Sequence, residues 1–99
     1  MSRERQRFET HEQRLAIYER DCGLCAYCGR LVDINSFTVA HRIARTKAML
    51  HKYGREVIEH PLNKACTHPG ACNDLIQITN NPVEREALVQ VIRSAMRGD

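Results

Sequence analysis

This sequence of 99 residues contains no tryptophan and has only three tyrosines and two phenylalanines. So few aromatic side chains argue against a dedicated platform for stacking the bases of single-stranded nucleic acid. No apolar run approaches the roughly 20 residues that a membrane-spanning helix requires, so we expect no membrane partner. The first residues are basic, but they lack the apolar segment and the small-residue cleavage site of a secretory signal, which predicts a cytoplasmic location.

Size and charge are those of one small domain. The net charge is +3, the pI is near 8.7, and 42% of the residues are hydrophobic. We expect a single domain over 1–99, and a bound metal ion would help so small a core to fold. The mild positive charge permits nucleic-acid binding without demanding it. Residues 1–9 form a basic N-terminal tail, although the glutamates interleaved with the first arginines are also typical of an ordinary solvated surface.

Two capping boxes predict helices near the ends of the chain. Thr10 and Gln13 have the types and spacing that exchange hydrogen bonds at the start of a helix, here over 10–20. Asn81 begins a second box, directly before a proline, and apolar residues then recur at helical spacing over 81–97.

The middle of the chain adds strand signals, so the predicted fold class is α+β. Residues 37–43 are rich in β-forming side chains and alternate in polarity, which predicts a strand. In that strand Val39 and His41 share one face, and Ala40 lies on the other. The other expected elements are a hairpin over 24–31, a helix over 44–53, a structured but irregular loop over 55–66 and a helix that begins near 72–76.

The cysteines predict a metal site. Thiols stay reduced in a chain that is not exported, so they are better explained as metal ligands than as disulfides. Cys25 and Cys28 form a Cys-x2-Cys knuckle, and Gly29 relaxes the backbone that follows it. Cys66 and Cys72 are separated by five residues, more than is usual, so the loop between them must bulge. We predict that these four cysteines hold one structural zinc ion.

Spacing leaves three alternatives open. His68 competes with Cys66 as the fourth ligand, and Cys22 forms an overlapping Cys-x2-Cys pair with Cys25. The thiols would otherwise be buried or reactive cysteines, or a redox pair, although the βαβ context of a redox motif is missing.

Four segments, YERDCGLCAYCG, TVAH, HPLN and ACN, together resemble an HNH endonuclease with an embedded treble-clef zinc site, over about residues 17–78. The resemblance implies a small ββα-metal domain with flanking N-terminal and C-terminal helices. It also implies that His41 is the general base, that Asn63 orients this base or holds its strand, and that Asn73 binds a divalent metal ion.

Hydrolysis of a phosphodiester explains these residue types. A neutral imidazole such as that of His41 can take the proton from the attacking water, while Mg²⁺, Mn²⁺ or Ni²⁺ would stabilise the charge on the phosphate. One departure is Ala40, which stands where many members of the family have an acidic metal ligand. His60 and Asp74 are the best substitutes by position, and a site containing histidine would favour Mn²⁺, Ni²⁺ or Zn²⁺ over Mg²⁺.

Basic residues close after this histidine are predicted to contact DNA phosphates: Arg42, Arg45, Lys47 and Lys52. The predicted function is a metal-dependent DNA endonuclease, working alone, as a homodimer or with a protein partner. Two alternatives are a treble-clef module that binds nucleic acid or acts as an adaptor after its cleavage site decayed, as Ala40 allows, and a zinc-stabilised protein-interaction module.

Overall fold

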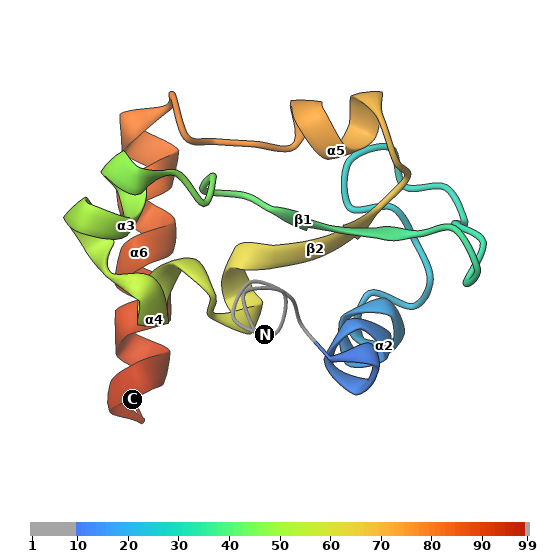
Figure 1. The fold of residues 1–99 in the computed structure, drawn as a ribbon, viewed down its shortest axis with the longest axis horizontal. Coiled ribbons are helices and arrows are strands. Elements are labelled where there is room, and N and C mark those ends of the chain that lie inside the picture. The colour runs from blue at the N-terminus through green and yellow to red at the C-terminus, as the bar shows by residue number, and fades with distance from the viewer. Residues whose placement is uncertain (1–9, 99) are drawn as a thin grey trace, which may run out of the picture.

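The computed structural model describes residues 10–98, which fold around a two-stranded antiparallel sheet (Figure 1). Along this part of the chain the elements are α2 (His11–Arg20), β1 (Thr38–His41), α3 (Lys47–Tyr53), α4 (Arg55–Ile58), the 3₁₀ helix η1 (Pro61–Asn63), β2 (Lys64–Thr67), α5 (Ala71–Leu75) and α6 (Pro82–Arg97). The α+β class is therefore confirmed. The basic tail expected over 1–9 lies outside the described residues. None of the helices within 10–98 combines the length and the apolar character needed to cross a membrane.

Side-chain caps fix the two terminal helices as predicted. At the start of α2, the Thr10 hydroxyl accepts a hydrogen bond from the Gln13 N–H at 3.1 Å, and the Gln13 side chain accepts one from the Thr10 N–H at 2.9 Å. At the start of α6, the Asn81 side chain accepts from the Glu84 N–H at 3.2 Å. These contacts satisfy backbone donors that have no partner within the helix.

The sheet contains one predicted strand and one that the sequence did not predict. β1 lies within the expected strand, and it pairs with β2 so that His41 is opposite Lys64. The expectation of an irregular loop over 55–66 is wrong, because this segment contains α4, η1 and the first part of β2. His60 has the extended backbone predicted for a residue before Pro61, which ends α4. The chain then pairs with β1, and such long-range pairing leaves no local signal in the sequence.

The two faces of the sheet pack against different helices (Figure 1). On one face, Val39 packs against the cluster that contains Ile17 of α2. On the other, Ala40 packs against Ile76, the residue after α5. Because side chains alternate along a strand, the side chain of His41 emerges on the α2 side, and Ala40 occupies the α5 side.

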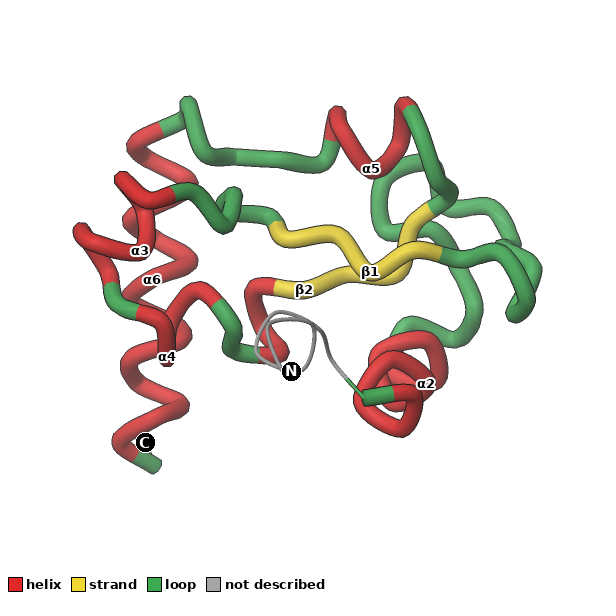
Figure 2. The backbone as a smooth tube through the Cα atoms, viewed as in Figure 1, coloured by secondary structure: helices red, strands yellow, loops and turns green. Residues whose placement is uncertain are grey.

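A second and larger apolar core lies between α6 and the short helices α3 and α4 (Figure 2). Its buried members are Ile43, Tyr53, Val57, Ile58, Ile78, Val89 and Ile92. Val89 and Ile92 lie about one turn apart on α6, so a single helical face supplies both. Ile43 belongs to this core, so the core begins just beyond the end of β1, close in sequence to His41.

Candidate functional site

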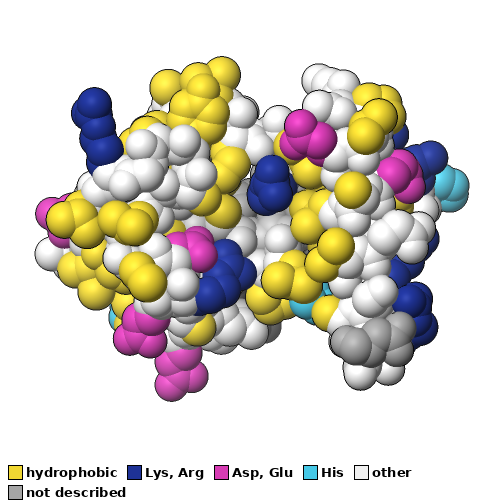
Figure 3. Space-filling view, turned by 180° about the vertical axis from the view of Figure 1, so that it is seen from behind, with side chains coloured by type: hydrophobic (Ala, Val, Ile, Leu, Met, Phe, Trp, Pro, Cys, Tyr) yellow, Lys and Arg dark blue, Asp and Glu magenta, His cyan; other side chains and the backbone are white. Residues whose placement is uncertain are grey.

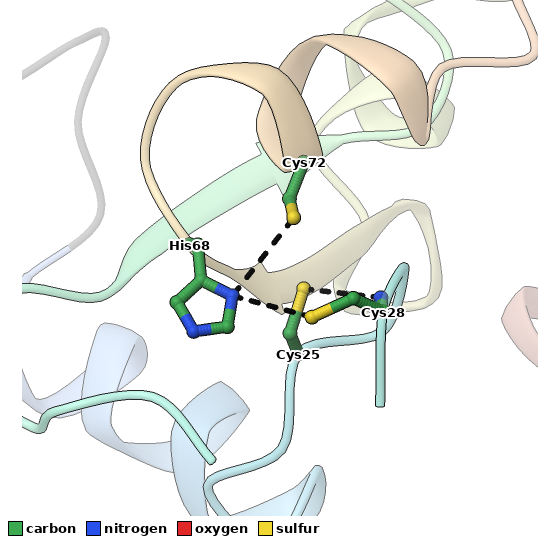
Figure 4. Close-up of side chains that lie close together, drawn as sticks. All are labelled: Cys25, Cys28, His68 and Cys72. Carbon is green, nitrogen blue, oxygen red and sulfur yellow. Dashed lines mark hydrogen bonds between the residues drawn. The ribbon is translucent and has the colours of Figure 1, made fainter. Parts of the chain in front are cut away.

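Three cysteines and one histidine bring their ligand atoms together beyond the end of β2 (Figure 4). The ligand atoms of Cys25, Cys28, His68 and Cys72 all lie within 4.8 Å of one another, and no other group of three or more Cys, His, Asp or Glu residues within 10–98 does so. His68 Nδ1 lies 3.4 Å from Cys28 Sγ and 3.9 Å from Cys72 Sγ. A Cys₃His set that can close around one ion is typical of a structural zinc site.

The first two ligands lie on a tight knuckle. The Cys28 N–H lies 3.5 Å from Cys25 Sγ, and the Gly29 N–H donates to the Cys25 carbonyl at 2.8 Å. Gly29 has φ 80°, in the left-handed region that glycine adopts without strain. A single antiparallel bridge between Leu24 and Leu31 closes the predicted hairpin.

His68 is held in the orientation that a metal ligand needs. Its Nε2 lies 3.1 Å from the Leu31 carbonyl, which can only accept, so Nε2 carries the proton. The lone pair of Nδ1 then faces the thiols, and this second-sphere hydrogen bond fixes both the tautomer and the ring. Gly70, with φ 86°, turns the chain so that Cys72, four residues after His68, returns to the same cluster.

The thiols themselves call for a cation. Burial opposes ionisation of Cys25, but N–H groups of Cys28, His68 and Tyr27 and the His68 ring outweigh burial and lower its pKa to about 6. Burial and the neighbouring Cys25 and Cys28 raise the pKa of Cys72 to about 11. Ionisation of all three adjacent thiols is favoured by a positive charge between them, which a bound zinc ion would supply.

The structure corrects the fourth ligand that the sequence favoured. Cys66 is fully buried in β2, in the cluster beside Ile17, and burial together with nearby negative charge raises the pKa of its thiol. Strand pairing directs this side chain into the core beneath α2, so His68, the alternative that spacing left open, takes its place. Cys22 is exposed just after α2 and lies outside the cluster, which resolves the overlapping pair in favour of Cys25.

The predicted base, His41, is paired with a carboxylate that the sequence did not single out. His41 Nε2 lies 3.1 Å from Glu59 Oε1. Glu59 also accepts a hydrogen bond from Arg45 Nε and lies 3.5 Å from Lys64 Nζ. An ionised carboxylate only accepts, so the proton of a neutral imidazole resides on Nε2, and Nδ1 is left as the acceptor. This is the arrangement of a base and the group that orients it.

Glu59 is ionised in this setting. Burial alone would raise its pKa, but hydrogen bonds from His41 and Arg45, and the charges of His41 and Lys64, outweigh burial and lower the pKa below its ordinary value. A cleft of about 280 Å³ opens beside Glu59 and Lys64, between them and α2. The carboxylate therefore remains a hydrogen-bond acceptor at neutral pH, within reach of a solvent-accessible cleft.

Asn63 braces the segment that follows β1. Its side chain is fully buried, its Oδ1 accepts from the Ile43 N–H at 2.8 Å, and its Nδ2 donates to the carbonyls of Ile43 at 3.1 Å and Ile58 at 2.8 Å. The Asn63 carbonyl also accepts from the Arg42 N–H at 2.8 Å. These contacts hold the backbone that follows β1 against η1 and the end of α4, while the predicted role of Asn63 in catalysis stays a prediction.

The residues expected to bind a catalytic cation do not form a cage around His41. His60 Nδ1 accepts the Leu62 N–H at 3.1 Å. Asn73 and Asp74 lie on α5, across the sheet from the His41 face. Ala40, at the position of the expected acidic ligand, is buried among apolar side chains on that same α5 side. These residues do not fit a hard-cation site, which needs several converging oxygen ligands.

The four basic residues predicted to contact DNA have different surroundings. Arg45 is paired with Glu59. Lys47 and Lys52 are exposed on α3. Arg42 directly follows β1, is half-buried and lines a hollow in the surface.

Comparison with known proteins gives no match to any protein-family model, curated protein or solved structure. The likeness to HNH endonucleases therefore stays a prediction from the motifs.

Changing the metal ligands one at a time tests the corrected set. We expect wild-type protein to retain about one zinc per chain, and His68→Ala and Cys72→Ser to lose it and unfold at lower temperature. Cys66→Ala and Cys22→Ser are the matched controls and should keep the metal, although Cys66→Ala is less stable because it leaves a buried void. Elemental analysis and thermal melts measure both effects. Loss of zinc from Cys66→Ala together with retention in His68→Ala would instead establish the four-cysteine set.

Replacing Glu59 tests the ion-pair cluster through pH. A carboxyl whose pKa is lowered on folding stabilises the fold above its unfolded pKa, and this contribution is lost as pH falls through the folded pKa. Glu59→Gln should therefore melt below wild type at about pH 7, and the gap should narrow as the pH falls through the folded pKa of Glu59. Glu56→Gln, an exposed change on the same helix, is the control and should show a small gap at either pH. A gap for Glu59→Gln that is independent of pH would contradict the assignment.

Proposed function

We propose that this chain is a DNA endonuclease of HNH type, in which His41 is the general base for phosphodiester hydrolysis. The observation that carries the proposal is the hydrogen bond between His41 and Glu59. It leaves Nδ1 as the acceptor for a water proton, and it stabilises the imidazolium that forms once that proton is taken.

The order of parts along the chain supports the same proposal. A zinc knuckle precedes β1, His41 ends that strand, Asn63 braces it from η1, and β2 leads to the remaining metal ligands and α5. This is the order that the motifs implied for an HNH unit. Zinc would serve only to hold the frame, because all four sites of a tetrahedral ion are taken by protein and none is left for water or substrate.

No step is assigned to a divalent cation, because the candidate ligands do not converge. Negative charge on the phosphate would be stabilised by nearby basic groups, which act most strongly where water is partly excluded. Lys64, which is largely buried beside Glu59, is the nearest candidate in the cleft.

A second function is favoured by one specific observation. Ala40 and Ile76 fill the α5 side of the sheet with apolar contact where an acidic ligand was expected. A domain with this arrangement would bind nucleic acid on its zinc-stabilised frame without cutting it, as a binding or adaptor module.

Nicking of supercoiled plasmid distinguishes the two functions. We expect wild type to convert supercoiled into open-circle DNA, and His41→Ala to be slower by about 100-fold or more, because a positioned base contributes this much. His51→Ala removes an exposed histidine from α3 and should cut like wild type. Reactions with Mg²⁺, Mn²⁺, Ni²⁺, Zn²⁺ and chelator show whether any cation is needed.

Equal nicking by wild type and His41→Ala would exclude His41 as the base. If wild-type protein binds DNA in a salt-sensitive way but does not nick it with any cation, the binding module is the correct function.

A further inference from the structure

Arg42 differs from the other arginines in the described part of the chain. Its backbone is fixed on both sides, because its N–H donates to the Asn63 carbonyl and its own carbonyl accepts from the Ile78 N–H, each at 2.8 Å. Its Nε is buried and has no hydrogen-bond partner, and it is the one such side-chain atom within 10–98. A buried donor on a charged group without an acceptor is costly, so this nitrogen calls for an acceptor that the protein itself does not supply.

The surface around Arg42 is hollowed. A hollow of about 370 Å³ is lined by Arg42, Arg20 and Lys64, with Ala65 and Ile76 among its apolar walls. Two further hollows, of about 270 and 340 Å³, also have Arg42 in their walls. Figure 3 shows the back of the molecule, where the surface is recessed near its centre and basic side chains lie in and beside the recess.

Acidic side chains near Arg42 already have partners. Asp21 lines the larger hollow, but its carboxylate accepts from Arg20, at 2.9 and 3.1 Å, and from the Cys66 N–H, at 2.9 Å. Glu84 lines the two smaller hollows, and its carboxylate accepts from the Asn81 side chain at 3.2 Å. Neither carboxylate is within hydrogen-bond distance of Arg42 Nε.

We propose that Arg42 binds a phosphate group of a nucleic-acid backbone in the larger hollow. A phosphate offers two oxygens to the planar guanidinium fork, and one of them would accept from Nε. Arg20 is already engaged by Asp21 and by the carbonyls of Pro61 and Lys64. Lys64 Nζ lies 3.5 Å from Glu59, so Arg42 is the basic residue of this hollow that is left to bind an anion. The inference rests on the proposed function in that DNA is the expected ligand, and it adds a specific anchor next to His41 in sequence.

Paired charge-removing variants test this site. Arg42→Gln should weaken binding of a fluorescein-labelled DNA duplex by about tenfold, and should lower the slope of log affinity against log salt by about one. Arg93→Gln removes the same charge from an exposed position on α6 and should leave affinity and slope within about twofold of wild type. Equal losses in the two variants would overturn the site, since only net charge would then matter.

Arg42→Lys guards against a folding artefact. It keeps the charge but lacks the Nε donor and the fork, so binding should still fall, by about threefold or more, in a protein whose circular dichroism and melting temperature match wild type. Unchanged DNA affinity in a folded Arg42→Lys would overturn the role of Nε.

Inorganic phosphate separates a nucleic-acid site from a site for small anions. In ¹H–¹⁵N spectra, the duplex should shift the amides of Ala65 and Ile76 in wild type and not in Arg42→Gln. If millimolar phosphate shifts these amides equally and displaces the duplex, the hollow is a site for a small phosphate. If the duplex shifts only other residues, the hollow is not a DNA-binding site.

DNA binding by Arg42→Gln is also measured in the His41→Ala background, where loss of the proposed base leaves only the binding step. The two proposals can then fail separately. Loss of binding in Arg42→Gln alongside absent nicking by wild type would support the anchor and reject the nuclease. Nicking by wild type with unchanged DNA binding in Arg42→Gln would support the nuclease and reject the phosphate anchor.

Discussion

The convergence of three thiols and one imidazole on a single point is the constraint on which the rest of this fold depends. Cys25 and Cys28 come from the knuckle after α2, while Cys72 lies in the first turn of α5 and His68 precedes that helix. Burial and the neighbouring Cys25 and Cys28 raise the pKa of Cys72, so the three cysteines would ionise together only beside a cation. A zinc ion bound there would join two segments whose nearest ligands, Cys28 and His68, are 40 positions apart, and would add to the folding energy of a domain whose own cores are small.

The predicted metal site is connected to His41 through the sheet. β2 leads directly into the metal ligands and pairs with β1, which places Lys64 opposite His41. Asn63, buried just before β2, fixes the backbone beyond β1 and links the sheet to the helical core around α6. The pairing of His41 with Glu59 therefore depends on elements that are far apart in sequence, and a loosened metal clamp would disturb it from a distance.

Local signals were sufficient for part of this structure. Capping residues such as Thr10 and Asn81 predict the starts of their helices, because their hydrogen bonds join residues only three positions apart and so depend on local sequence. The fourth metal ligand was harder to predict, because the favoured Cys66 and the alternative His68 lie only two residues apart. Strand pairing, which places the Cys66 side chain in the core, decides between them. The shorter spacing from His68 to Cys72 was the available signal. Glu59 belongs to no motif, because α4 brings it to His41 through tertiary packing that no window of sequence records.

X-ray absorption at the zinc edge tests the central claim most directly, because it counts the ligand types around the metal in purified protein. The account predicts one zinc with three sulfur neighbours at about 2.3 Å and one nitrogen neighbour at about 2.0–2.1 Å. In His68→Ala the nitrogen shell should vanish or the metal should be lost, while in Cys66→Ala the spectrum should match wild type. A shell of four sulfurs in the wild type, or a fully folded protein that binds no metal, would contradict the Cys₃His centre.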